Sequence, residues 1–180
     1  GLYTGITLRY ANAPGNYLRQ RTYYPGGTIF IAYTHPKQMY KAIATFLTDK
    51  FTNYENGGIK DVDVFLSNTE NNRKTILINL EKAYSASKVS QFVLQQSYKL
   101  SKQTLQNDSV QQRKRRFDLG QFVHTLNYSS EGNSFSDISS NPAFYPHVFA
   151  DSSNVYDTMH IRKFENTFAY TNMVPDTSEN

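Results

Sequence analysis

The feature that most constrains the fold is the order of periodic segments between Thr28 and Tyr128. Hydrophobic residues recur there with the period of a strand, then a helix, two strands, a second helix and a last strand. This order is typical of the β-α-β-β-α-β arrangement, in which two helices lie across one face of a mostly antiparallel sheet. The sequence therefore predicts an α+β fold, a two-layer sandwich with a ferredoxin-like core.

The six predicted core elements are read from their hydrophobic spacing. Thr28 to Tyr33 (TIFIAY) is short, apolar and β-branched, which favours a central strand. A capping hydroxyl at Thr34 and Pro36 in the first turn favour a helix start, and an apolar stripe at helical spacing follows. The predicted elements after this first strand are a helix over 36–53, strands over 62–66 and 76–80 joined by a polar loop, a long helix from about 85 to 106, and a closing strand over 116–128.

The segments on either side of this core differ from it in pattern. Residues 1–27 are strand-rich with a turn signal at Pro25, Gly26 and Gly27, which predicts an N-terminal β arm. Residues 129–142 are rich in Ser, Asn and Gly and lose periodicity, which indicates a loop. Aromatic residues then return as either a last strand or a short helix. We expect three parts: an arm (1–27), an α+β core domain (28–128), and a loop with an irregular aromatic C-terminal extension (129–180).

Composition excludes some classes of site. The 180 residues contain no cysteine, so disulfides, thiolate metal sites and cysteine nucleophiles are absent from the sequence. No run of 18 apolar residues and no basic-then-apolar leader occur, so we expect neither a membrane span nor a retained signal peptide. Gly1 in place of Met indicates a processed or cropped start.

Charge is distributed unevenly along the chain. The net charge is +4, but residues 1–120 hold 17 basic against 8 acidic residues, and residues 121–180 hold 2 against 7. A basic body with an acidic tail favours either nucleic-acid binding through the body or head-to-tail contact between subunits. The alternative is that the tail folds back on its own body.

The most concentrated local charge is a basic run that follows the second predicted helix. Three interpretations stay open: contact with a phosphate backbone, contact with an acidic partner surface, or a solvated loop without a role. Two lysines on the preceding helix extend the patch. The interaction residues predicted here are Lys99, Lys102, Arg113, Lys114, Arg115 and Arg116.

Catalytic and metal-binding patterns are nearly absent from the sequence. No two histidines have the i, i+4 spacing of a metal clamp, and no nucleophile motif or phosphate-binding lysine motif occurs. Asp61 and Asp63 would act as paired carboxylates on a strand, although alternating Asp residues more commonly mark the solvated side. We expect no enzyme activity, no cofactor, no metal and no small-molecule substrate.

The helix, hairpin, second helix and closing strand of residues 28–128, with irregular arms, resemble the neck and tail-terminator proteins of tailed bacteriophages. The resemblance implies a non-enzymatic subunit of a homo-oligomeric ring in a virion or the host cytoplasm, with structural proteins as partners and no membrane. A nucleic-acid-binding domain is the alternative. The aromatic residues predicted to contact other subunits are Phe144, Tyr145, Phe149, Tyr156, Phe164, Phe168 and Tyr170.

Overall fold

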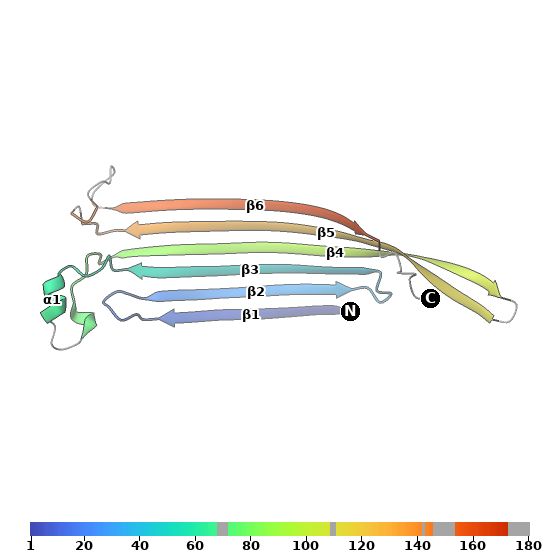
Figure 1. The fold of residues 1–180 in the computed structure, drawn as a ribbon, viewed down its shortest axis with the longest axis horizontal. Helices are drawn as coiled ribbons and strands as arrows, with labels where there is room; N and C mark the ends of the chain where they lie inside the picture. Colours follow the sequence, from blue (N-terminus) through green and yellow to red (C-terminus); the bar gives the residue numbers. More distant parts are fainter. Residues whose placement is uncertain (68–71, 109–110, 142, 146–153, 173–180) are drawn as a thin grey trace, which may run out of the picture.

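Six antiparallel strands, among the residues that the structure describes, form one sheet in the computed structural model (Figure 1). The strands lie side by side in chain order, so each pairs with the next through an antiparallel ladder. The structure describes residues 1–67, 72–108, 111–141, 143–145 and 154–172, without the side chains of 64 and 101–118. The strands are β1 (Leu2–Ala13), β2 (Thr22–Thr34), β3 (Tyr40–Glu55), β4 (Ala83–Asp108), β5 (Gln111–Asp137) and β6 (Val155–Thr171).

The connections differ between the two ends of the sheet. At one end, a short turn over 35–39 joins β2 to β3, and β4 and β5 continue beyond the other strands as a hairpin (Figure 1). At the opposite end lie the longer connections over 14–21, 56–82 and 138–154. We call this second end the loop end. Its 56–82 connection contains α1 (Val62–Ser67) and a 3-10 turn, Arg73–Thr75.

The β4–β5 hairpin changes direction where it leaves the sheet. Its register shifts between Leu100 and Ser101, which marks a β-bulge, and Gly120 lies opposite Leu100. Gly120 has a φ of +109°, and a Cβ there would lie 2.7 Å from the carbonyl oxygen of Thr171. The position therefore requires glycine.

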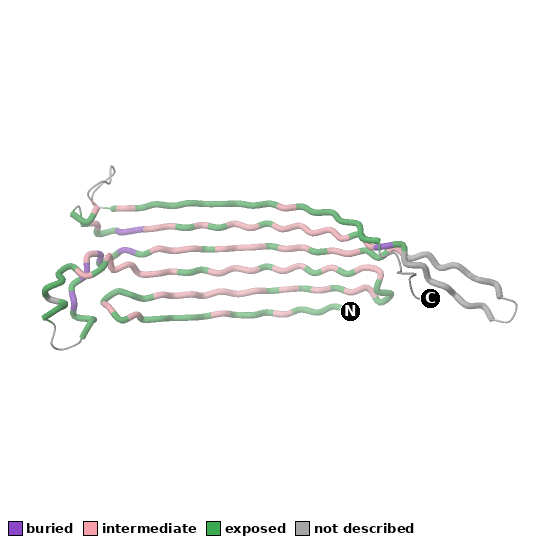
Figure 2. Tube along the Cα trace, in the orientation of Figure 1, coloured by how far each residue is buried: buried purple, intermediate pink, exposed green. Residues whose placement is uncertain are grey.

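Little of the described chain is buried, because the sheet is one layer thick (Figure 2). The buried apolar residues of the described part lie at the loop end, in or beside the 56–82 connection: Ile76, Ile78, Leu80 and Ala83. Beside them Asp137 is fully buried and accepts hydrogen bonds from the Tyr145 hydroxyl and the Ser139 amide, each 3.1 Å long. These contacts tie the loop after β5 to the end of its strand.

The α+β two-layer sandwich is wrong, because both predicted long helices are strands. Residues 36–53 lie mostly in β3, and residues 85–106 lie in β4. The apolar residues of β3 fall on both faces of the strand, with Phe46 on one face and Ile43 and Leu47 on the other. Two half-apolar faces produce gaps of three and four residues that imitate a helical stripe.

The predicted hairpin over 62–80 is wrong as well. Residues 62–66 form most of α1, which here is only six residues long. Residues 76–80 contribute one isolated bridge, between Ile59 and Ile78, and three buried side chains. Their alternation reflects burial within the loop and not a sheet.

Other segments are predicted correctly. Residues 28–33 lie in β2 and residues 116–128 in β5, and of the two alternatives for the aromatic C-terminal segment the strand is right, as β6. The turn expected at Pro25 is wrong, because β2 continues through it. Its pairing with β3 passes over Tyr24 and Pro25. The loop expected from residue 129 begins only after Asp137. One sheet thus holds residues of the expected arm, core and extension.

Candidate functional site

The register of the strands places most large apolar side chains on one face of the sheet. Directly paired residues of an antiparallel ladder project to the same side, and every second residue shares that side. One row of directly paired residues, with one residue from each strand, therefore defines the apolar face. On each strand, the residues at even distances from that row project to the same face. That row is Ile6, Ile29, Phe46, Phe92, Tyr128 and Phe164.

The side chains of the apolar face are exposed to an unusual degree. Leu8 is 83% exposed and Phe168 is 74% exposed. Soluble monomers rarely expose apolar patches of more than a few hundred Å². This face therefore requires an apolar environment. Its large exposed members are Leu2, Ile6, Leu8, Tyr10, Ile29, Ile31, Tyr33, Phe46, Tyr84, Phe92, Tyr98, Phe122, Tyr128, Tyr156, Phe164, Phe168 and Tyr170.

Aromatic rings gather toward both ends of the apolar face. At the loop end, the rings of Tyr10 and Tyr23 lie 5.4 Å apart, and those of Tyr54 and Tyr84 lie 6.4 Å apart. At the opposite end the ring pairs are Tyr33 with Tyr40, at 6.3 Å, and Phe122 with Tyr170, at 5.0 Å. Tyrosine combines an apolar ring with a polar hydroxyl, which suits a boundary between an apolar phase and water.

A chain of four polar side chains crosses the apolar face from β3 to β6. The Tyr40 hydroxyl donates to Gln96 at 2.7 Å, Gln96 bonds His124 Nδ1 at 3.2 Å, and His124 Nε2 bonds Asn166 at 2.8 Å. A neutral imidazole protonated on Nε2 satisfies both bonds to His124, with Gln96 and Asn166 as its partners. The His124 ring also stacks on Phe168, with centroids 4.3 Å apart. These polar groups thus bond one another across the apolar face.

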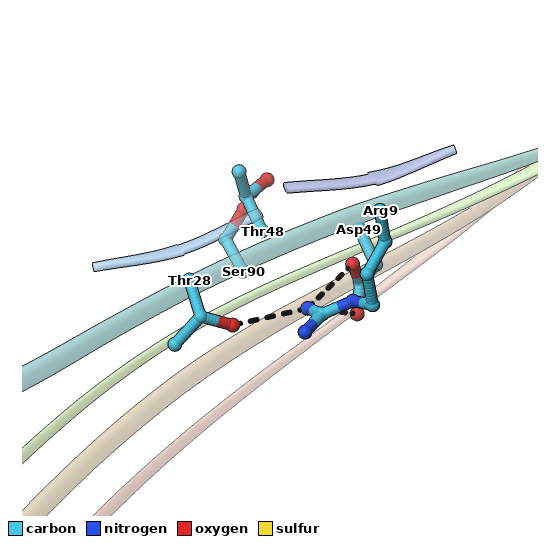
Figure 3. Close-up of polar contacts among 5 residues, drawn as sticks. All are labelled: Arg9, Thr28, Thr48, Asp49 and Ser90. Carbon is cyan, nitrogen blue, oxygen red and sulfur yellow. Dashed lines mark hydrogen bonds and ion pairs between the residues drawn. The ribbon is translucent and has the colours of Figure 1, made fainter. Parts of the chain in front are cut away.

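The opposite, polar face carries an ion pair that spans three strands. Arg9 of β1 donates to Asp49 of β3 at 3.0 Å and to Thr28 of β2, also at 3.0 Å (Figure 3). The side chains of Arg9 and Asp49 are 34% and 20% exposed. Thr48 precedes Asp49, projects to the apolar face and bonds Ser90 at 3.2 Å. Neighbouring residues of one strand thus project to opposite faces of the sheet.

Two more hydrogen-bonded chains lie on the polar face. The first chain runs from β4 to β6: Gln91 bonds Asn127 at 3.0 Å, Asn127 bonds Glu165 at 2.9 Å, and Glu165 pairs with Lys163 at 2.8 Å. The second chain has three hydrogen bonds of 2.6–2.9 Å. They join Thr22 to Asn53, Asn53 to Glu55, and Glu55 to Ser85. Polar contacts therefore connect neighbouring strands across this face.

Charged side chains follow the same division. Of the described strand residues, the polar face carries both acids and bases, whereas the apolar face carries three bases, Lys50, Lys88 and Arg162, and no acid. These three cations lie on the loop-end side of the Phe46 row. The charged residues of the polar face are Arg9, Lys41, Asp49, Glu55, Lys99, Glu131, Asp137, Asp157, Lys163 and Glu165.

One titratable group of the loop end is perturbed. Partial burial, and secondarily the hydrogen bond to Asp137, raise the pKa of the Tyr145 phenol to about 12. The neutral phenol is the form that donates to the Asp137 carboxylate, so the contact is kept through the ordinary pH range.

In the part of the chain that the structure describes, no helix is both long and apolar enough to span a bilayer. Within the same part, no three His, Asp or Glu side chains gather as metal ligands do. Asp61 and Asp63 lie at the start of α1, where the Asp63 amide donates to the Asp61 carboxylate at 2.9 Å. They are not the strand-borne pair that the sequence predicted.

Comparison with known proteins identifies a family. A family described as “Putative porin” matches residues 2–174. The chain belongs to this porin family. No curated protein and no solved structure matches it significantly.

Membership of the porin family corrects several predictions. The resemblance to bacteriophage neck and tail-terminator proteins is wrong, and with it the virion-ring function and the location in a virion or host cytoplasm. The nucleic-acid-binding alternative receives no support, and the prediction of no membrane partner conflicts with a porin family. The error has a physical origin, because apolar residues on both faces of β3 imitate the spacing of an amphipathic helix.

The predicted interaction residues lie on β4 and β5. Lys99 projects to the polar face. The side chains of Lys102, Arg113, Lys114, Arg115 and Arg116 lie outside the described residues, although their backbone belongs to the β4–β5 hairpin. The contact of these residues with a phosphate or an acidic partner stays a prediction.

The predicted interface aromatics fall into two groups. Phe144 and Tyr145 lie in the loop after β5, with ring centroids 5.0 Å apart, and Phe149 lies outside the described residues. The others project from β6 on the apolar face: Tyr156, Phe164, Phe168 and Tyr170. Their contact with another subunit stays a prediction.

The sequence reasoning missed the residues that define the polar face, including Arg9, Asp49 and Glu165. The signal that finds Arg9 is alternation with period two in β1, and the same alternation in β6 runs only from Lys163 to Tyr170. Asp49 lies in β3, where apolar residues fall on both faces and hide the alternation.

Proposed function

We propose that this chain forms part of the wall of a membrane pore. The apolar face contacts lipid, the polar face lines a water-filled lumen, and the strands belong to a β-barrel. The observation that carries the proposal is the segregation of charge: every acid of the described strand residues projects to the polar face, and the apolar face carries only three bases, all on its loop-end side. The function is passage of small solutes and ions, without catalysis.

Strand length supports this arrangement. A transmembrane strand needs about 9–11 residues when tilted, and β1, β2, β3 and β6 contain 12, 13, 16 and 17. Strands can cross a bilayer where both of their edges are paired, as those of β2, β3, β4 and β5 are here.

The apolar band runs obliquely across the strands. On β1 it reaches Leu8 and Tyr10, whereas the positions in the same rows on β6 are Arg162 and His160. The band on β6 occupies Phe164 to Tyr170, which is shifted toward the hairpin end. An oblique band is expected when strands are tilted relative to the membrane normal, as they are in barrels.

The described sheet is open, since β1 and β6 do not pair with each other. Unpaired backbone groups are costly in lipid, and bacterial single-chain barrels have about eight strands or more. We therefore propose that both edges pair with further strands, of the same polypeptide or of another copy.

Conductance in planar bilayers tests the function. Full-length protein purified in detergent and added to one side of the bilayer is expected to give discrete current steps. Detergent alone and heat-denatured protein serve as controls. Correctly inserted protein without steps, and without solute flux into vesicles, would contradict a pore.

The ion pair of the polar face gives a sharper test. Asp49→Asn leaves the Arg9 charge without its partner and is expected to shift the reversal potential in a salt gradient toward anion selectivity. Arg9→Gln is expected to shift it toward cation selectivity. Two variants with the wild-type potential would show that this face does not line the conduction path.

A further inference from the structure

A basic hollow lies on the apolar face at the loop end. Its volume is about 700 Å³, and its wall combines side chains of β2, β3 and β4 with residues of the adjoining connections. Four cations line it, Arg19, Arg21, Lys50 and Lys82, and no acidic residue does. A hollow with this lining is suited to an anionic ligand.

The cations of the hollow have no acid beside them among the described ion pairs, which lie on the polar face. Arg21 donates through Nε to the neutral amide oxygen of Asn12 at 3.0 Å, so its charge is not compensated there. Lys50 lies directly opposite Lys88 in the ladder, on the same face. Like charges in that position are unfavourable, and an anion bound between or beside them would relieve the repulsion.

The position of the hollow indicates what kind of anion reaches it. Its remaining lining includes Tyr23, Tyr54 and Tyr84, the rings that border the apolar face at the loop end. From Lys50 the same face of β3 continues through Thr48 to the apolar Phe46. In a membrane, tyrosines of this kind lie at headgroup level, so the cations are presented to the headgroups and the apolar band to the acyl chains.

We propose that this hollow binds the phosphate-bearing headgroup of an anionic membrane lipid. The inference rests on the proposed function, since it requires the apolar face to contact lipid. The cations recognise the phosphate charge, the tyrosine rings flank the headgroup, and the acyl chains lie along the neighbouring apolar side chains.

The test uses the full-length protein in nonionic detergent, with bound lipids counted by native mass spectrometry. Phosphatidylglycerol, phosphatidylcholine with the same acyl chains, and inorganic phosphate are titrated separately. Wild-type protein is expected to prefer phosphatidylglycerol. Because each basic residue near an anionic lipid surface contributes roughly fivefold in affinity, the double variant Arg21→Gln with Lys50→Gln is expected to bind it about twenty-five-fold more weakly.

Two further variants keep the result interpretable. Lys37→Gln with Lys41→Gln removes the same charge at the other end of the sheet and is expected to bind phosphatidylglycerol as the wild type does. Arg21→Lys with Lys50→Arg keeps the charge and is expected to retain most of the binding. Loss of binding in the charge-conserving pair would indicate misfolding instead of a lost charge contact, and that is checked by circular dichroism.

Three results would overturn the proposal. They are equal affinity for the two lipids, unchanged affinity in the Arg21→Gln with Lys50→Gln variant, and binding of inorganic phosphate as tight as that of the lipid, which would indicate a site for free anions. Retention of the protein in membranes after an alkaline wash is measured in parallel. If the protein stays in the membrane but shows no lipid preference, only the lipid site is refuted. If the wash releases the protein, the proposed pore is contradicted as well.

Discussion

Gly120 is the residue on which the departure of the β4–β5 hairpin from the sheet depends. Its φ of +109° is unfavourable for any side chain, and an added Cβ would meet the backbone of β6. We expect Gly120→Ala to lower the free energy of unfolding by about 1–3 kcal/mol, the usual cost of such strain. Urea titration of the protein in lipid vesicles, followed by circular dichroism, measures it.

Gly132 provides the matched control. A Cβ there would meet only the ring of His160, at 2.9 Å, and an exposed side chain can move aside. We expect Gly132→Ala to cost less than Gly120→Ala. Equal costs would show that the backbone at Gly120 is not under the constraint described.

At the scale of a single element, the two faces of β4 are expected to tolerate charge very differently. Phe92 projects from the apolar face in the row that crosses the middle of the sheet. We expect Phe92→Arg to destabilise the inserted protein by about 2–4 kcal/mol, the cost of a cation near the bilayer midplane. The same urea titration measures this loss.

The neighbouring residue is the control. Gln91 projects to the polar face, where it donates to Asn127, and an arginine retains a donor at that position. Gln91→Arg is expected to change the stability by less than about 1 kcal/mol, since lumen positions accept charge. Similar losses for both variants would mean that the two faces meet the same environment.

The strands also show which parts of the fold can be predicted from sequence. Residues 28–33 form a short run that is apolar after Thr28 and rich in β-branched and aromatic residues, so no helical spacing competes and the strand is recognised. In β3, apolar residues on the polar face, such as Ile43 and Leu47, fill the gaps between those on the apolar face and imitate a helix. The apolar face can be identified only after the register is known.

At the scale of the whole molecule, the two ends of the sheet are expected to lie on opposite sides of the membrane. Barrels of the outer membrane have short periplasmic turns and longer extracellular loops. The 35–39 turn is short, whereas the connections at the loop end are longer. We therefore expect the loop end to face the cell exterior.

Labelling in intact cells measures this orientation. Asn16→Cys, in the β1–β2 connection, is expected to react with a membrane-impermeant maleimide, and Lys37→Cys, in the β2–β3 turn, only after the outer membrane is permeabilised. The opposite pattern would reverse the orientation.

The pairing of residues on the polar face could not be predicted from the sequence, because it depends on how whole strands align. Arg9 and Asp49 are 40 residues apart and meet only because β1, β2 and β3 align in one register. Charge counts along the chain, which separated a basic body from an acidic tail, average over both faces of every strand. The division that matters alternates residue by residue.

Cysteine scanning of β3 tests most directly whether one face meets lipid and the other meets water. The chain has no cysteine of its own, so single cysteines can replace Ala44, Thr45, Phe46 and Leu47 in turn and be exposed, in vesicles, to a charged thiol reagent. We predict that Thr45→Cys and Leu47→Cys react and that Ala44→Cys and Phe46→Cys are protected. Uniform reactivity, or protection recurring every three to four residues as on a helix, would contradict the two-faced wall.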